Sequence, residues 1–221
     1  MKPEFVKFPR THWLPISEKP YKTERYLTKN ELQKLFSQEV NVSEKLDGAN
    51  VGLSFRQDKL ILQKRGGFIR TGEHSQYGAF KKWAYERYEE FSHLPQETIL
   101  FGEWLYVKHS IHYTMLPDYF IVFDIWQNGK FLPVAERDSV AMRFGLCVVP
   151  TIYEGILSLD DIRSLIRESN YSDELMEGIV ARGLKNPDLR GKYVRHDFIT
   201  GQKHWSKYKI TKNLLNKTTK W

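Results

Sequence analysis

Short runs of alternating apolar and polar residues, each ended by a turn, constrain the fold of this chain more than any other feature. The clearest case is Asn128-Gly129 between two such runs, because this pair suits a two-residue hairpin turn. Strands are predicted over 40–43, 51–55, 60–63, 99–106, 119–126 and 148–153. Capping residues and helical spacing predict helices over 29–37, 76–91, 135–144 and 158–167. Many short strands with a few scattered helices predict an α+β fold with mostly antiparallel sheets.

The length and composition narrow the class of protein. The chain has 221 residues, which suits one large domain or two small ones. No apolar run approaches the ~20 residues that span a membrane, and the first residues lack the apolar core of a secretion signal. The single cysteine, Cys147, excludes an internal disulfide. We therefore expect a protein of a reducing, cytoplasmic setting with no membrane partner.

The charge and the aromatic content are compatible with a nucleic-acid partner. The formal net charge is +7 and aromatic residues make up 14% of the chain, which suits phosphate contacts and base stacking. Basic and aromatic residues are mixed in 7–14, which contains Arg10, and in 189–198, which contains Lys192 and Arg195. These three residues are the candidates for nucleic-acid binding. The alternative is a basic protein without such a partner.

One turn carries a candidate nucleophile. Lys45 stands two residues before Asp47-Gly48 and five before Asn50, between two predicted strands. A lysine amine is a nucleophile when its charge is suppressed or offset, and glycine lets the backbone approach a ligand closely. A covalent nucleotide site is therefore one interpretation, and a solvated lysine on an ordinary hairpin is the other. Asp47 would either orient Lys45 or cap the turn.

Carboxylates stand inside two apolar runs. Glu103 lies within the strand predicted over 99–106, on the face of Phe101 by alternation, and Glu177 precedes another apolar run. A buried carboxylate must be paired or hold a metal ion. The alternative for Glu103 is an edge strand that turns it to solvent. Arg65, in a basic turn with two glycines, could contact a phosphate or simply be exposed.

Taken together, these features form an ordered set that resembles the covalent nucleotidyltransferase superfamily of DNA ligases, RNA ligases and mRNA capping enzymes. The matching motifs are Lys45-Leu46-Asp47-Gly48, Phe101-Gly102-Glu103-Trp104, Phe123-Asp124-Ile125, Glu177-Gly178-Ile179-Val180 and Lys207-Tyr208-Lys209. Within the superfamily the chain looks most like ATP-dependent RNA ligases of the nick-sealing phage type and their bacterial relatives. Asn50 and the small size are typical of that branch.

The resemblance implies a fold and a reaction. The fold is two mostly antiparallel sheets with flanking helices around a nucleotide cleft, the ligase nucleotidyltransferase or ATP-grasp-like arrangement. Lys45 would attack the α-phosphorus of ATP and form lysyl-AMP. The AMP would pass to the 5′-phosphate of an RNA end, and a 3′-hydroxyl would displace it. Neighbouring cations and bound metal would lower the pKa of Lys45 so that a neutral amine is available.

The resemblance also implies roles for the site residues. Glu103 and Glu177 would hold Mg²⁺ or Mn²⁺, and the catalytic lysines Lys207 and Lys209 would neutralise the α-phosphate of the ATP substrate. Arg65 would contact a phosphate, and Phe123 would stack on the adenine. Glu44 and the Lys45 backbone would bind the edge of the adenine, and Asn50 would support the sealing steps.

The expected partner is RNA with 5′-phosphate and 3′-hydroxyl ends, bound by a monomer. The chain is expected to be a single nucleotidyltransferase domain over 1–221, without the OB-fold or helical domain that usually follows the last motif, because only 11 residues follow Ile210. A separate end-healing or RNA-binding protein could supply that part. The alternatives are a DNA ligase or guanylyl-transferring relative, and a non-catalytic nucleic-acid-binding domain that keeps the fold.

Overall fold

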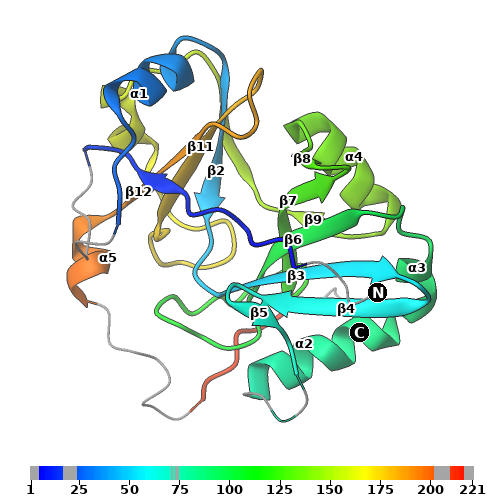
Figure 1. The fold of residues 1–221 in the computed structure, drawn as a ribbon. Helices are drawn as coiled ribbons and strands as arrows, with labels where there is room; N and C mark the ends of the chain where they lie inside the picture. The colour runs from blue at the N-terminus through cyan, green and yellow to red at the C-terminus, as the bar shows by residue number, and fades with distance from the viewer. Residues whose placement is uncertain (1–4, 17–23, 71, 73–74, 202–209, 217–221) are drawn as a thin grey trace.

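Two β-sheets form the framework of the chain (Figure 1). The computed structural model describes residues 5–16, 24–70, 72, 75–201 and 210–216. The first sheet has the order β1-β12-β11-β2-β10, with bounds His12–Trp13, Arg190–Val194, Gly178–Gly183, Val40–Lys45 and Thr151–Gly155. Its β10–β2, β2–β11 and β11–β12 pairs are antiparallel, and β1 runs parallel to β12.

The second sheet has the order β5-β4-β3-β6-β7-β8, and β9 pairs with β7. The bounds are Gly67–Phe68, Lys59–Lys64, Ala49–Arg56, Thr98–Trp104, Phe120–Gln127, Lys130–Phe131 and, for β9, Cys147–Val148. The sequential pairs from β5 to β8 are antiparallel, and β7–β9 is parallel. The expected α+β class with two mostly antiparallel sheets is confirmed.

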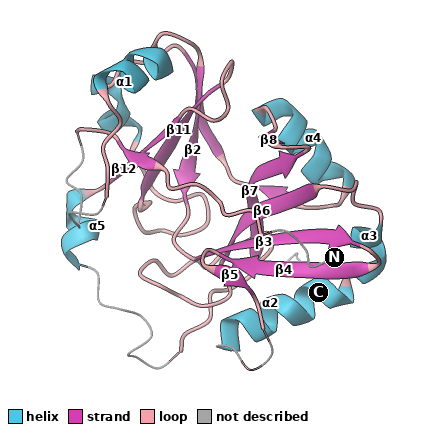
Figure 2. Cartoon of the chain, viewed as in Figure 1, coloured by secondary structure: helices cyan, strands magenta, loops and turns pink. Residues whose placement is uncertain are grey.

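Helices pack against both sheets (Figure 2). Their bounds are α1 Lys29–Phe36, α2 Ser75–Glu86, α3 Tyr88–Ser92, α4 Val134–Arg143, the 3₁₀ helix η1 Asp160–Leu165 and α5 His196–Gly201. Phe80 and Trp83 of α2 pack on Trp104 of the second sheet. Leu35 of α1 packs in a cluster with Val42 of the first sheet. Within the described residues, no helix is long and apolar enough to cross a membrane.

Most of the predicted elements are present, with three differences. Asn128 and Gly129 have φ of 49° and 85°, so the predicted hairpin turn is confirmed. The helix predicted over 76–91 is divided into α2 and α3 at Arg87, and the helix predicted over 158–167 is the shorter 3₁₀ helix. The strand predicted over 148–153 is interrupted at Pro150, which lacks a donor for a ladder hydrogen bond. As a result β9 and β10 belong to different sheets.

The Lys45 turn is one of the places where the chain passes between the sheets. β2 ends at Lys45 in the first sheet and β3 begins at Ala49 in the second. Gly48 is required here, because a Cβ at this position would lie 2.7 Å from the carbonyl oxygen of Trp104 and 2.7 Å from Leu105 Cδ2. The candidate nucleophile is therefore the last residue of β2, directly before a short connection that is pressed against β6.

Candidate active site

Lys45 and Glu177 meet as an ion pair on the first sheet. Lys45 Nζ lies 2.6 Å from Glu177 Oε1. The contact follows from the register, because Gly178 at the start of β11 pairs with Lys45 at the end of β2 and Glu177 directly precedes it. The Lys45 side chain is 27% exposed and that of Glu177 is 8% exposed. The Lys45 side chain is thus partly exposed, while its partner is nearly covered.

Glu103 approaches the same amine from the second sheet. It pairs with Asn50 across β3 and β6, so the two side chains share one face, and β6 is an interior strand flanked by β3 and β7. The Gly48 N–H donates to Glu103 Oε1 at 3.1 Å. The edge-strand alternative for Glu103 is therefore wrong. Burial raises the pKa of Glu103 to about 8, and Glu177 adds to the rise while Lys45 opposes it.

The three carboxylates around Lys45 dominate its electrostatics. Burial lowers the pKa of Lys45, but Glu177, Glu103 and Asp47 outweigh burial and raise it above its ordinary value. Burial also raises the pKa of Glu177 to about 7, against the opposing charge of Lys45. Without metal or nucleotide these carboxylates favour the cationic amine, and the lower pKa that the resemblance implies would require bound metal together with the neighbouring cations. Three carboxylates thus surround a single amine.

Asp47 fixes the turn to a neighbouring loop. Its Oδ2 accepts hydrogen bonds from the backbone N–H groups of Ser110 at 2.6 Å and Ile111 at 3.1 Å. Its own N–H donates to the buried Tyr113 hydroxyl at 2.8 Å. These contacts bind the turn to a distant loop and do not cap the backbone of the turn itself, and the charge of Asp47 also acts on Lys45. The Asp47 carboxylate thus binds a loop that is more than sixty residues away in the sequence.

Glu44 lies on the other face of β2 from Lys45. Its carboxylate accepts hydrogen bonds from the Ser169 hydroxyl, the Asn170 N–H at 3.1 Å and Asn170 Nδ2 at 2.9 Å. The side chain is buried and saturated with partners. Any contact of Glu44 with a nucleotide on the Lys45 face would come from its backbone.

The comparisons with known proteins can now be set beside this geometry. The family model described as RNA ligase matches residues 38–209. The chain belongs to the RNA ligase family. No curated protein sequence matches the chain. The match covers Lys45, Glu103 and Glu177, so the ion pair and the opposing carboxylate lie within the part of the chain that defines the family.

Solved structures of an RNA ligase from Naegleria gruberi share the fold. A mutant with AMP and Mn is 16% identical with a TM-score of 0.65, over 90% of this chain and 59% of that one. A mutant with ATP and Mn is 18% identical with a TM-score of 0.60, over 78% and 54%. An apo mutant is 17% identical with a TM-score of 0.62, over 78% and 53%. This RNA ligase family member thus spans between half and three fifths of the Naegleria chains.

Lys192 is a second lysine close to Lys45. It lies on β12, two strands from β2, and its Nζ is 3.2 Å from Glu24 Oε2 and 4.4 Å from the centroid of the Trp13 ring. Burial lowers the pKa of Lys192, and the charge of Lys45 lowers it further against the effect of Glu24. The sequence indicated nucleic-acid binding for this residue. The sequence analysis did not predict the strand over 190–194. Alternation of side chains along that segment could have indicated it, and would have placed Lys192 on the same face of the sheet as Lys45.

The other predicted site residues are spread more widely. Arg65 is exposed in the turn between β4 and β5. Arg195 Nε donates to the Met176 carbonyl at 2.7 Å, so this guanidinium secures the backbone ahead of Glu177. Lys207 and Lys209 lie outside the described residues.

Phe123 lies on β7, and its ring is partly buried. Its centroid is 5.0 Å from that of Phe8 with the planes at 72°, an edge-on contact with the N-terminal segment. Phe8 also packs on Phe101 and Phe131. Edge-on packing stabilises this aromatic cluster and sets the orientation of the Phe123 ring.

A buried charge cluster at Asp124 was missed by the sequence reasoning, which took this residue only as part of a motif. Asp124 on β7 forms ion pairs with Arg182 of β11, at 3.0 Å, and with Arg190 of β12. One carboxylate of the second sheet therefore binds two guanidinium groups of the first. Arg137 of α4 donates to the neighbouring Phe123 carbonyl at 3.0 Å. Arg182 was recognisable only as a charged residue in an apolar run, and the other two arginines stand among polar residues.

Proposed function

We propose that the chain is an ATP-dependent RNA ligase that works through a lysyl-AMP intermediate on Lys45. The observation that carries this proposal is the 2.6 Å contact of Lys45 Nζ with Glu177 in a chain of the RNA ligase family, with Glu103 facing the amine from the other sheet. A non-catalytic binding domain has no need of a partly exposed lysine among buried carboxylates. This arrangement suits nucleophilic attack on a phosphate.

The first step forms a P–N bond. Lys45 Nζ loses a proton and attacks the α-phosphorus of ATP, the P–O bond to the β-phosphate breaks, and pyrophosphate leaves. Glu177 is positioned to hold the amine at 2.6 Å, and the proton that the amine loses passes to solvent. Lys192 is a candidate for neutralising charge on the α-phosphate, alongside Lys207 and Lys209.

The residues present fit a divalent metal ion. Glu103 and Glu177 are covered carboxylates that face one amine from two sheets, and hard oxygen ligands suit Mg²⁺ or Mn²⁺. Within the described part of the chain there is no group of three or more His, Cys, Asp or Glu side chains that could hold a metal. Such a pair fits an ion that also takes substrate phosphates and water as ligands. The ion would supply positive charge that offsets the phosphates and carboxylates.

The later steps move AMP to RNA and seal the end. A 5′-phosphate oxygen attacks the lysyl-AMP phosphorus and the P–N bond breaks, which returns the electron pair to Lys45. The 3′-hydroxyl then loses its proton and attacks the 5′-phosphorus, and AMP leaves. Asn50, on the face of Glu103, is positioned to orient this end, and we assign Arg65 a phosphate contact, Phe123 the adenine and Arg10, Lys192 and Arg195 the RNA strand.

Finer features belong to the same proposal. Asn50 supports the nick-sealing phage-type branch, in which RNA with 5′-phosphate and 3′-hydroxyl ends is the substrate. Residues 1–221 would form a single nucleotidyltransferase domain that acts as a monomer, alone or with an end-healing or RNA-binding protein. The cytoplasmic setting rests on the single, free Cys147.

The proposal is tested by covalent labelling with ATP or GTP carrying ³²P at the α-phosphate, with Mg²⁺ or Mn²⁺. We expect label from ATP, and Lys45→Ala should lower it by at least about 1000-fold because the acceptor atom is gone. Lys130→Ala, which removes an exposed lysine from the β7–β8 hairpin, is the matched control and should label normally. If neither ATP nor GTP labels the protein, the proposal is wrong. Sealing of nicked RNA against nicked DNA then identifies the substrate.

A further inference from the structure

The segment 211–216 packs along residues 105–119, the connection between β6 and β7. The Lys108 N–H donates to the Thr211 carbonyl at 2.8 Å, and backbone hydrogen bonds continue to the end of the segment. The two stretches are far apart in the sequence, so they meet only in the folded chain. The connection also carries the backbone N–H groups that bind Asp47. A residue that secures the connection therefore acts on the turn beside the candidate nucleophile.

Asn213 of this segment is fully buried and is bound to the connection by all four of its polar groups. Its Nδ2 donates to the Leu105 carbonyl at 2.8 Å, and its Oδ1 accepts from the Tyr113 N–H at 3.0 Å. Its own N–H donates to the Tyr106 carbonyl at 3.2 Å, and its carbonyl accepts from the Tyr119 hydroxyl at 3.0 Å. Loss of the side chain would leave a buried donor and a buried acceptor without partners.

Tyr113 joins Asn213 to the Lys45 turn. Its side chain is fully buried, and its hydroxyl accepts from the Asp47 N–H at 2.8 Å. The Asp47 carboxylate in turn accepts from the N–H groups of residues 110 and 111. The connection is thus bound by Asn213 on one side and by Asp47 on the other, and Asp47 is two residues from the reacting lysine. No proposed step of the reaction uses Asn213 or Tyr113.

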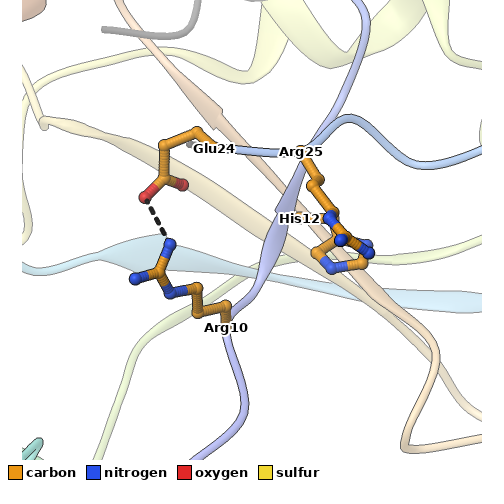
Figure 3. Close-up of a pocket in the computed structure, with 4 residues that line it drawn as sticks. All are labelled: Arg10, His12, Glu24 and Arg25. Atoms are coloured by element: carbon orange, nitrogen blue, oxygen red, sulfur yellow. Dashed lines mark ion pairs between the residues drawn. The ribbon is translucent and has the colours of Figure 1, made fainter. Parts of the chain in front are cut away.

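A second support of the site, on the first sheet, is of a different kind. Glu24 lines a cavity beside β1 and pairs with Arg10 at 3.9 Å (Figure 3). The same carboxylate pairs with Lys192 at 3.2 Å. These charged groups are partly exposed, so dissolved salt screens their attraction. The contacts of Asn213 join uncharged groups in the interior, so a change of salt concentration distinguishes the two supports.

We propose that Asn213 is a positioning residue of the ligase reaction, which holds the Lys45 turn in place through Tyr113. The inference rests on the proposed function for the chemistry at Lys45. The amine must approach the α-phosphorus in line with the leaving pyrophosphate, and a misplacement of about 1 Å can lower a rate about 100-fold. Without Asn213 the connection is released, and Asp47 moves with it. The turn then shifts relative to Glu103, which is fixed within β6.

The first test is hydrogen exchange in the full chain without nucleotide, with mass spectrometry of peptides covering 43–51 and 105–113. Asn213→Ala should speed exchange in both peptides by about tenfold, the scale of one lost hydrogen bond, at low and at high salt. Gln38→Ala is the matched control, because Gln38 is also a buried amide and accepts from the N–H groups of residues 185 and 186 beyond the far end of β2. It should leave both peptides unchanged. Unchanged exchange in Asn213→Ala would overturn the inference.

The second test is the rate of Lys45 labelling. At saturating ATP we expect Asn213→Ala to lower the rate about 100-fold, while the ATP concentration for half-maximal labelling changes by less than about twofold, because position and not binding is lost. Gln38→Ala should label normally. Tyr113→Phe keeps the ring but removes the acceptor for the Asp47 N–H. The double variant with Asn213→Ala should lose no more than the larger single loss, because both changes act through one contact.

The outcomes separate this inference from the proposed function. Multiplied losses in the double variant would overturn the route through Tyr113. A wild-type chain that takes no label, but whose exchange responds to Asn213→Ala, would support the hold on the turn and count against the lysyl-AMP proposal. Circular dichroism shows whether each variant folds. If Asn213→Ala does not fold, Tyr113→Phe replaces it, and faster exchange in the peptide 43–51 is then the expected result.

Discussion

Two charge clusters between the sheets are built in opposite ways. At one, a single lysine, Lys45, is surrounded by carboxylates, and its side chain is 27% exposed. At the other, a single carboxylate, Asp124, is surrounded by arginines and is 2% exposed. The first cluster has an excess of negative charge and the second an excess of positive charge.

The two clusters differ in how far the protein encloses them, and this difference decides what each cluster does. At Asp124 the protein encloses the arginines: Arg182 donates to the carbonyls of Leu132 and Pro187, and Arg190 stacks over the Phe131 ring at 4.4 Å. Arg182 Nη1 and Arg190 Nε and Nη2 are buried without a hydrogen-bond partner. Burial lowers the pKa of Arg182 to about 10, although Asp124 acts to raise it. A closed cluster of this kind joins the two sheets. The open, acid-rich cluster at Lys45 can instead accept a metal ion and a nucleotide.

The largest expected effect comes from breaking the closed cluster. Asp124→Ala leaves two buried guanidinium groups without their counter-charge, so we expect the free energy of unfolding to fall by about 3–5 kcal/mol. Urea denaturation followed by far-UV circular dichroism measures this change. The control is Glu86→Gln, which removes the exposed partner of Lys82 on α2 and should cost under about 1 kcal/mol. Equal losses in the two variants would contradict a special role for Asp124.

The matching change in the open cluster should separate activity from stability. Glu103→Gln keeps the shape but removes a carboxylate, and we expect Lys45 labelling to fall about 100-fold because a charge that holds the metal is lost. The free energy of unfolding should change by less than about 1 kcal/mol, because burial already disfavours the charged form of Glu103. Labelling at various Mn²⁺ concentrations and urea denaturation give the two numbers. Loss of stability without loss of labelling would reverse the roles of the clusters.

A methyl group at Gly48 should disturb the open cluster through its backbone. Gly48→Ala places a Cβ against the Trp104 carbonyl, so we expect a loss of about 1–3 kcal/mol in stability, typical of overpacking. The hydrogen bond from the backbone N–H at position 48 to Glu103 Oε1 should lengthen as the turn moves away from β6. Gly66→Ala is the matched control, because a Cβ there meets nothing within 4 Å. Thermal denaturation of both variants tests whether close approach, and not glycine itself, is required.

The smallest expected effect is at the edge of the open cluster. Glu24→Gln weakens the hold on Lys192, and we expect the labelling rate to fall by about tenfold or less, in line with one charge-assisted contact. Glu136→Gln, an exposed glutamate in the first turn of α4, should label at the normal rate. Rates of label incorporation at saturating ATP provide the comparison. An unchanged labelling rate in Glu24→Gln would contradict a role for Lys192 in the reaction.

Local features of the site were predictable because they depend on neighbours in sequence. The hairpin at Asn128-Gly129, the capping box at Thr28 and the face shared by Glu103 and Phe101 follow from turn chemistry and alternation. The interruption at Pro150 and the strand at 190–194 were missed. Both depend on which sheet the segment joins, and that choice is made by partners far along the chain.

The sequence alone determined the class of fold, the family resemblance and the order of the motifs, because periodicity and turn residues act over a few positions. Only the tertiary structure decided which charges meet. Glu24 reaches Lys192 across 168 residues, and Arg190 reaches Asp124 across 66. Sheet register sets these pairings and burial sets their energies, and neither is encoded in the spacing of the residues themselves. The acid-rich surroundings of Lys45 arise in the same way, from carboxylates on two different sheets.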